Sequence, residues 1–237
     1  MNNILNPPEL ETLIFGQKFS SEYKGNLIHI FGEAGTGKTT MALQIAIAVC
    51  LRGKKVIIID TEGKIGGEKI QAIAGTDNLT QVNKSLKLYC PQKFDEQHDL
   101  IERLDFYLKN QEIGLIVIDT ITNLYRQEML FKKSNKSAFE KLAYQIAFLR
   151  RLSRERNIPI LIFNQATMLK PSEKDPLILK RERVNPVAKA IMSYWSDREI
   201  IFIKQGWGKF EARIPSEFEG RVLFEISNKG ITHLEDE

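Results

Sequence analysis

The residues best suited to chemistry stand in a glycine-rich loop near the start of the sequence. This loop reads Gly32-Glu33-Ala34-Gly35-Thr36-Gly37-Lys38-Thr39 and is followed by Thr40. It fits the pattern G-x-x-x-x-G-K-[ST] without a mismatch. Glycines let successive backbone N–H groups turn toward an anion, and a following helix adds the positive end of its dipole. The loop therefore predicts a site for the phosphates of a nucleoside triphosphate, most simply ATP. Lys38 is expected on the β- and γ-phosphates and the Thr39 hydroxyl on Mg²⁺.

Three further polar residues follow apolar runs. Asp119 ends Leu-Ile-Val-Ile-Asp, where a carboxylate can complete the Mg²⁺ shell. Glu62 follows a second run and is placed to hold a water beside the γ-phosphate. Gln165 follows a third run, where an amide can donate to the γ-phosphate and sense its loss. Taken singly, each also fits a plain reading as a polar strand end or a solvated loop residue. Only the phosphate loop is decisive by itself.

Short β-branched runs alternating with helical patterns must position these residues. Strands are expected at 26–31, 55–60, 86–90, 115–119 and 158–164. The runs at 56–59 and 115–118 are continuously apolar, which is typical of parallel strands covered on both faces. Helices are expected at 39–51, at 95–110 and from Ser137. There Ser137-Ala-Phe-Glu140 matches a capping box, and an apolar stripe beginning with Phe139 faces the sheet.

After about residue 197 the pattern changes to strands alone, at 199–204, 209–214, 222–226 and 231–234. Short glycine-containing turns between them are typical of hairpins. The predicted fold is therefore α/β. A largely parallel, twisted sheet is flanked by helices and extended by a C-terminal antiparallel β-meander.

The composition of the chain bears on whether nucleic acid or a membrane can be its partner. Its 237 residues carry a formal net charge of +4, which permits a nucleic-acid partner without requiring one. No apolar run approaches the ~18–20 residues that a membrane helix needs, so no membrane partner is expected. Cys50 and Cys90 lack metal-type spacing and fit buried apolar positions in a reducing compartment. A cytoplasmic location follows as the expectation.

The order of the motifs resembles the ATPase core of the RecA/RadA recombinase superfamily, from about residue 13 to 235. Within it, the archaeal RadB paralogues are the most similar group. The resemblance implies a single RecA-like P-loop NTPase domain over residues 1–237, with an N-terminal extension at 1–12. About a dozen residues before the core leave no room for the DNA-binding domain of full recombinases, and a Phe-x-x-Ala polymerisation motif is not found. We therefore expect an accessory role rather than a strand-exchange filament.

The resemblance also implies roles for particular residues. Glu62 matches the catalytic glutamate, acting with Lys38 and the γ-phosphate sensor Gln165. Lys69 matches a basic residue that packs on adenine, and Pro215 a proline that packs over a neighbouring subunit's nucleotide. Residues 119–128 resemble the first DNA-facing loop, with Arg126 as its DNA contact.

A basic segment follows the sensor. Residues 166–185 are expected to form a flexible, DNA-facing loop, since they combine two prolines with no hydrophobic period. Its positive side chains are Lys170, Lys174, Lys180, Arg181 and Arg183. They can neutralise DNA phosphates, although a charge-rich loop is more often simply solvated.

Three functions fit these features. The first is an ATP- and DNA-binding recombinase paralogue that assists homologous recombination and repair, with weak or slow Mg²⁺-dependent hydrolysis as a switch. Its expected partners are DNA, preferentially single-stranded, a RadA-type recombinase or other repair proteins, and other copies of itself. The second is a KaiC-like signalling ATPase that acts on proteins, and the third a small-molecule kinase. A single Glu62 followed by Gly63 disfavours the second, and the β-meander and Asn164-Gln165 disfavour the third.

Overall fold

The fold is described from a computed structural model of the chain. It describes residues 4–17, 25–109, 111–131, 136–169, 183–206, 208–217 and 220–234. No helix within these ranges is long and apolar enough to cross a membrane. Cys50 is buried as expected, whereas Cys90, just beyond an edge strand, is exposed.

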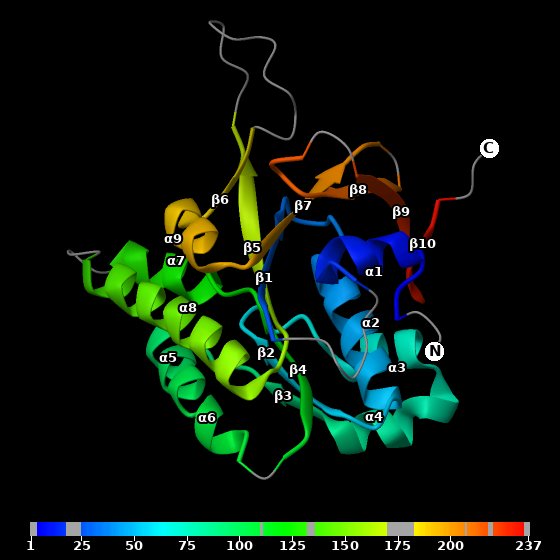
Figure 1. The fold of residues 1–237 in the computed structure, drawn as a ribbon, viewed down its shortest axis with the longest axis horizontal. Coiled ribbons are helices and arrows are strands. Elements are labelled where there is room, and N and C mark those ends of the chain that lie inside the picture. Colours follow the sequence, from blue (N-terminus) through cyan, green and yellow to red (C-terminus); the bar gives the residue numbers. More distant parts are fainter. Residues whose placement is uncertain are drawn as a thin grey trace, which may run out of the picture.

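A ten-stranded sheet forms the middle layer of the described molecule (Figure 1). Its order is β10-β9-β8-β7-β1-β5-β4-β2-β3, and β6 pairs with β5 alone. The strands are β1 (Leu27–Gly32), β2 (Lys55–Asp60), β3 (Leu86–Tyr89), β4 (Ile113–Asp119), β5 (Ile160–Met168), β6 (Val184–Pro186), β7 (Arg198–Lys204), β8 (Lys209–Arg213), β9 (Arg221–Ser227) and β10 (Gly230–His233). The strands from β7 to β3 in this order are parallel, and β8, β9 and β10 continue the sheet antiparallel.

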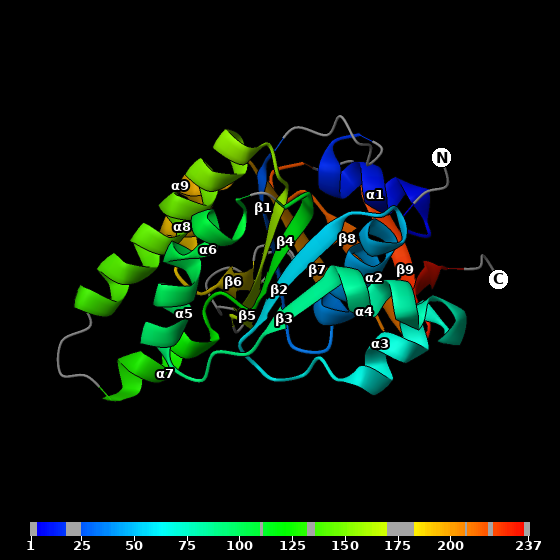
Figure 2. The same cartoon turned by 90° about the horizontal axis from the view of Figure 1, so that it is seen from below.

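Helices cover both faces of the sheet (Figures 1 and 2). On one side lie α1 (Pro8–Phe15), α2 (Lys38–Leu51), α3 (Gly67–Ala74), the 3-10 helix η1 (Thr76–Asn78) and α4 (Leu79–Ser85). On the other lie α5 (Phe94–Glu102), α6 (Leu104–Tyr107), α7 (Asn123–Phe131), α8 (Lys136–Arg156) and α9 (Lys189–Trp195). The expected α/β architecture with its antiparallel meander is confirmed.

The apolar runs are explained by this two-sided cover. In β2, Val56 and Ile58 pack with the α1–α4 side, while Ile57 and Ile59 pack with the α5–α9 side. Successive side chains of a strand point to opposite faces, so both sets must be apolar. A continuous apolar run is the result.

Several expected boundaries were wrong. The helix expected at 95–110 is two helices, α5 and α6, separated at Arg103. The α8 helix begins at Lys136, so Ser137 lies within its first turn rather than capping it. Phe139 is 46% exposed, and Ala138 occupies the buried stripe instead. A helical period of 3.6 aligns residue 138, not 139, with the buried Leu142 and Leu149.

Two expected loops contain regular structure. Arg126 lies on α7, so much of the segment expected to be the first DNA-facing loop is helical. The ends of the 166–185 segment are also strands, because β5 continues to Met168 and pairs with β6. The N-terminal extension is not separate from the core either: Ile4 and Leu5 are buried in it, and α1 begins at Pro8.

A chain of polar side chains crosses the interior beneath the carboxyl ends of the strands. The Thr122 hydroxyl donates to Oδ1 of Asn164 at 2.6 Å, and Nδ2 of Asn164 lies 3.3 Å from Nε2 of His29. On its other side, Nδ1 of His29 lies 2.8 Å from the Glu199 carboxylate, which also accepts from Ser193. An amide N–H can only donate, so Nε2 accepts and Nδ1 carries the proton. His29 is therefore neutral in the fold.

This arrangement predicts a loss of stability in mild acid. Burial lowers the pKa of His29 despite the opposing effect of Glu199. Below pH 6.5 His29 binds a proton in the unfolded chain but stays neutral in the folded chain. The free energy of unfolding therefore falls as the pH falls, by at most about 1.4 kcal/mol per pH unit. Urea unfolding of His29→Gln is expected to lose less stability between pH 7 and pH 5 than the unmodified protein. The exposed His233→Gln should behave like the unmodified protein. Equal losses in all three proteins would contradict this role for His29.

Candidate functional site

The phosphate loop joins β1 to α2, and carbonyl groups of the loop bind the ammonium of its own Lys38. Gly35 and Gly37 have φ of +77° and +89°, a left-handed conformation that glycine adopts without strain. The Lys38 ammonium, whose residue is 6% exposed, donates to the carbonyls of Gly32 at 2.9 Å and Glu33 at 2.7 Å. Burial lowers the pKa of Lys38 to about 8, against the opposing effects of Asp119 and Glu62. The loop is thus preformed around a desolvated cation.

The antiparallel meander reaches this loop from the far end of the sheet. A Cβ atom added to Gly37 would lie 2.6 Å from Cδ1 of Ile226, on β9. Glycine at position 37 therefore suits the left-handed backbone, and any side chain there would also have to displace the tip of Ile226. Ile226 also lines the cavity in front of the loop, a role that its position in the sequence did not suggest.

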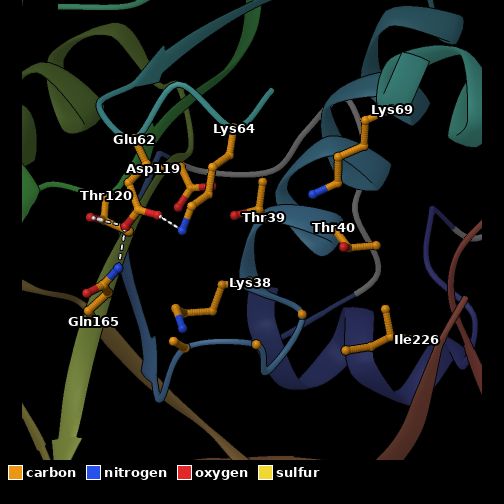
Figure 3. Close-up of a pocket in the computed structure, with 13 residues that line it drawn as sticks. Lys38, Thr39, Thr40, Glu62, Lys64, Lys69, Asp119, Thr120, Gln165 and Ile226 are labelled. Atoms are coloured by element: carbon orange, nitrogen blue, oxygen red, sulfur yellow. Dashed lines mark hydrogen bonds and ion pairs between the residues drawn. The ribbon is translucent and has the colours of Figure 1, made fainter. Parts of the chain in front are cut away.

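Strand register brings the other expected residues to the same edge. Gly32 on β1 is level with Gln165 on β5, and Asp60 on β2 is level with Asp119 on β4. Parallel strands end together at one edge, so groups at their carboxyl ends gather there although far apart in sequence. The structure therefore places the phosphate loop, Glu62, Asp119 and Gln165 around one cavity (Figure 3).

Asp119 and Thr39 form the part of the site that suits a cation. Both residues line the cavity, and burial raises the pKa of Asp119 to about 6. Oδ1 of Asp119 is buried and has no hydrogen-bond partner among the described residues. A buried carboxylate oxygen without a partner is costly unless a ligand satisfies it. Carboxylate and hydroxyl oxygens are the donors that Mg²⁺ prefers, so the residues fit that ion.

The Glu62 side chain contacts three neighbouring side chains of the site. Its carboxylate accepts from Nε2 of Gln165 at 2.5 Å and from the Thr120 hydroxyl at 3.3 Å, and it pairs with the Lys64 ammonium. The amide oxygen of Gln165 in turn accepts from Arg126 on α7 at 3.2 Å. The expected catalytic glutamate, sensor and DNA contact are therefore linked in one row.

Sequence reasoning missed the residue that shapes this loop. The buried Asp60 accepts from the backbone N–H groups of Glu62, Gly63 and Ile65, at 2.8 to 3.0 Å. Such side-chain to backbone bonds are typical of an Asp in a turn, and an aspartate beginning Asp-Thr-Glu-Gly was the available signal. Asp60 thus holds the backbone that presents Glu62, and its carboxylate is fully used in doing so.

A cavity of about 340 Å³ lies between these groups. Thr120, Gln165, Glu62 and Lys64 stand at one end, as Figure 3 shows, with Lys38 nearby. The other end is lined by Thr40, Lys69 and Ile226. The cavity is thus polar and charged at one end and mixed at the other, as a nucleotide with separate phosphates and base requires.

Of the remaining residues that the sequence predicted for the site, those that the structure describes do not line the cavity. Gly32, Glu33 and Thr36 support Lys38 through their carbonyls or hydroxyl and do not line the cavity among the described residues. Pro215 lies in the turn after β8, also away from the lining. Lys170, Lys174, Lys180 and Arg181 fall outside the described residues. Their segment leaves and rejoins the described chain at neighbouring points, because the Leu169 N–H donates to the Arg183 carbonyl at 2.8 Å.

A phosphate loop between β1 and α2, carboxylates ending neighbouring parallel strands and an antiparallel meander define the RecA-like fold of the P-loop proteins. A family model described as Rad51 matches residues 10–234. The RadB protein of Methanosphaera stadtmanae, called a DNA repair and recombination protein, is 37% identical over 88% of both chains. The RadB of Methanococcoides burtonii is 32% identical over 80% of this chain and 79% of its own. A crystal structure of the RadB recombinase matches with a TM-score of 0.70 and 27% identity, covering 96% and 97% of the two chains. The chain belongs to the Rad51 family, among its RadB members.

Proposed function

We propose that this protein binds ATP with Mg²⁺ and binds DNA, preferentially single-stranded, to assist homologous recombination and repair. Slow hydrolysis of ATP acts as the switch between its states. The observation that carries the proposal is the convergence of Lys38, Thr39, Asp119, Glu62 and Gln165 on one cavity. RadB relatives named as DNA repair and recombination proteins support the DNA role over the KaiC-like signalling alternative.

Each group has a distinct task. Backbone N–H groups of the loop and the Lys38 ammonium bind the phosphates. Thr39 and Asp119 would hold Mg²⁺, which when bound neutralises phosphate charge. Glu62 accepts a proton from a water whose oxygen attacks the γ-phosphorus, and the bond from that phosphorus to the ADP oxygen breaks. Lys69, with Thr40 and Ile226, receives the base at the far end of the cavity.

The row Arg126–Gln165–Glu62 connects this chemistry to DNA. Arg126 is exposed on α7 and contacts the sensor amide, which contacts the catalytic carboxylate. A γ-phosphate draws Gln165 toward itself, and a DNA phosphate draws Arg126 outward. Movement of Gln165 changes the position of Arg126, and movement of Arg126 changes the position of Gln165. ATP therefore favours the conformation that binds DNA, and DNA favours the conformation that binds ATP. Lys170, Lys174, Lys180, Arg181 and Arg183 supply further phosphate contacts, since their segment leaves β5 just past Gln165.

DNA binding provides the direct test. Single-stranded DNA is expected to be retained with the protein on a filter at 50 mM salt, with affinity falling at least about tenfold by 200 mM. Arg126→Ala should lower the slope of log affinity against log salt by about 0.7, the value of one phosphate contact on a single strand. The exposed Lys84→Ala, on α4, is the matched control and should leave the slope unchanged. Retention no better than that of an unrelated protein of charge +4 would overturn the DNA role.

Assembly and location complete the proposal. A role on chromosomal DNA places the protein in the cytoplasm, beside a RadA-type recombinase or other repair proteins. Pro215 packs over the nucleotide of a neighbouring copy if the protein forms oligomers. Gel filtration with and without ATP and DNA, alone and mixed with a RadA-type recombinase, separates monomer, small oligomer, filament and mixed complex in one measurement.

A further inference from the structure

Lys64 is a cation of the cavity that the proposed mechanism leaves unused. It lies two residues after Glu62, in the loop between β2 and α3, and lines the cavity with Lys38, Thr39 and Asp119. Its ammonium pairs with the Glu62 carboxylate (Figure 3). The position therefore adds a second lysine to the charged end of the nucleotide cavity, from the same chain as the phosphate loop.

The two lysines are held in different ways. Lys38 is buried and donates to two loop carbonyls and, at 3.3 Å, to the Thr36 hydroxyl, so its ammonium is fixed. The Lys64 side chain is 61% exposed, while the side chain of Glu62, with which it forms the ion pair, is 10% exposed. A long, largely exposed side chain can exchange one anion for another at low cost. Lys64 is thus the movable cation of the pair.

The backbone beneath Lys64 does not share this freedom. Asp60 accepts from the N–H groups on both sides of it, those of Gly63 and Ile65, and the Ile65 side chain is buried. The Cα of Lys64 therefore stays beside the cavity while the side chain turns about it. A terminal phosphate carries about two negative charges against one on a carboxylate, so a bound triphosphate is the stronger partner for the ammonium.

We propose that Lys64 is a second phosphate-binding lysine, which contacts the γ-phosphate of a bound nucleoside triphosphate and holds Glu62 when no γ-phosphate is present. The proposal rests on the nucleotide binding proposed above. It makes Lys64 the residue that distinguishes a triphosphate from a diphosphate. Its transfer also releases Oε2 of Glu62 from the ion pair, so this oxygen becomes available to take the proton of the attacking water only when a γ-phosphate has arrived.

Binding measurements test this without relying on hydrolysis. Affinities for a non-hydrolysable ATP analogue and for ADP, both with Mg²⁺, are measured by calorimetry. Lys64→Ala is expected to weaken the analogue about tenfold or more, the loss of one charge-assisted hydrogen bond, and ADP by less than about twofold. Lys64→Arg should keep most of the difference. The control Lys87→Ala, an exposed lysine on β3, should bind both nucleotides like the unmodified protein.

One further variant separates contact with phosphate from mere neutralisation of Glu62. In a Glu62→Gln background the carboxylate charge is absent, so a lysine that only neutralised Glu62 would have no remaining effect. We expect Lys64→Ala to weaken the analogue selectively in this background as well. Equal effects on both nucleotides, or loss of selectivity in the Glu62→Gln background, would overturn the role of Lys64 alone. Failure of the unmodified protein to bind either nucleotide would overturn the proposed function with it.

Discussion

Replacing Lys38 by alanine is expected to weaken the binding of Mg²⁺-ATP by about a hundredfold or more. The Lys38 ammonium is the buried cation of the phosphate loop, and a bound phosphate would replace its contacts with the carbonyls of Gly32 and Glu33. Each charge-assisted hydrogen bond to phosphate contributes about 1.5–3 kcal/mol, so losing two of them accounts for the effect. Calorimetric titration with a non-hydrolysable analogue measures it directly.

The control must separate lost binding from lost folding. Lys38 also supports the loop from within, so the unfolding transition of Lys38→Ala should be measured alongside Lys38→Met, which keeps the aliphatic stem. The exposed Lys84→Ala removes the same charge at a distance and should bind like the unmodified protein. A folded Lys38→Ala protein with undiminished affinity would show that the loop does not bind phosphate through this lysine.

Glu62→Gln is expected to bind ATP normally and to hydrolyse it about a hundredfold to ten thousandfold more slowly. The amide preserves the shape of the side chain and its hydrogen bonds with Thr120 and Gln165. It cannot take a proton from water, and removing a general base typically costs that much in rate. Release of phosphate under saturating ATP measures the turnover, and calorimetry with the analogue verifies that binding is intact.

A neighbouring glutamate provides the matched comparison. Glu68 lies in the first turn of α3 and is exposed, so Glu68→Gln removes one carboxylate near the cavity without touching its lining. It should hydrolyse ATP at the unmodified rate. If Glu62→Gln and the unmodified protein turn over ATP equally, Glu62 is not the base and the row from Arg126 to Glu62 has another purpose.

Much of the fold was predictable because its signals are local. The continuous apolar runs of β2 and β4 identified buried parallel strands, since a strand covered on both faces has no polar side. Gly53, with a φ of +82°, follows the last turn of α2, and a glycine in this conformation is a common and local signal of a helix end. Boundaries were harder to place. Nothing in the local pattern distinguishes one helix at 95–110 from the pair α5 and α6, because Ile101, Leu104 and Leu108 are buried either way.

Sequence reasoning missed Asp60 and Ile226 for two different physical reasons. The Asp60 carboxylate accepts from backbone N–H groups that follow it closely in the chain. The sequence Asp-Thr-Glu-Gly is compatible with such a turn but also with other loop conformations, so it did not identify this role. Ile226 belongs to β9, nearly two hundred residues after the phosphate loop it covers. Its place depends on the order of strands across the sheet, which no periodicity encodes.

The phosphate loop and the types of its partner residues were determined by the sequence alone. The glycines, Lys38 and Thr39 act through backbone conformation and side-chain chemistry contained in eight consecutive residues. Only the tertiary structure decided what each group touches: that Gln165 and Lys64 both hold Glu62, and that Arg126 reaches the sensor from a helix. Contacts across parallel strands are set by sheet order and register, and these become fixed only when the core has packed.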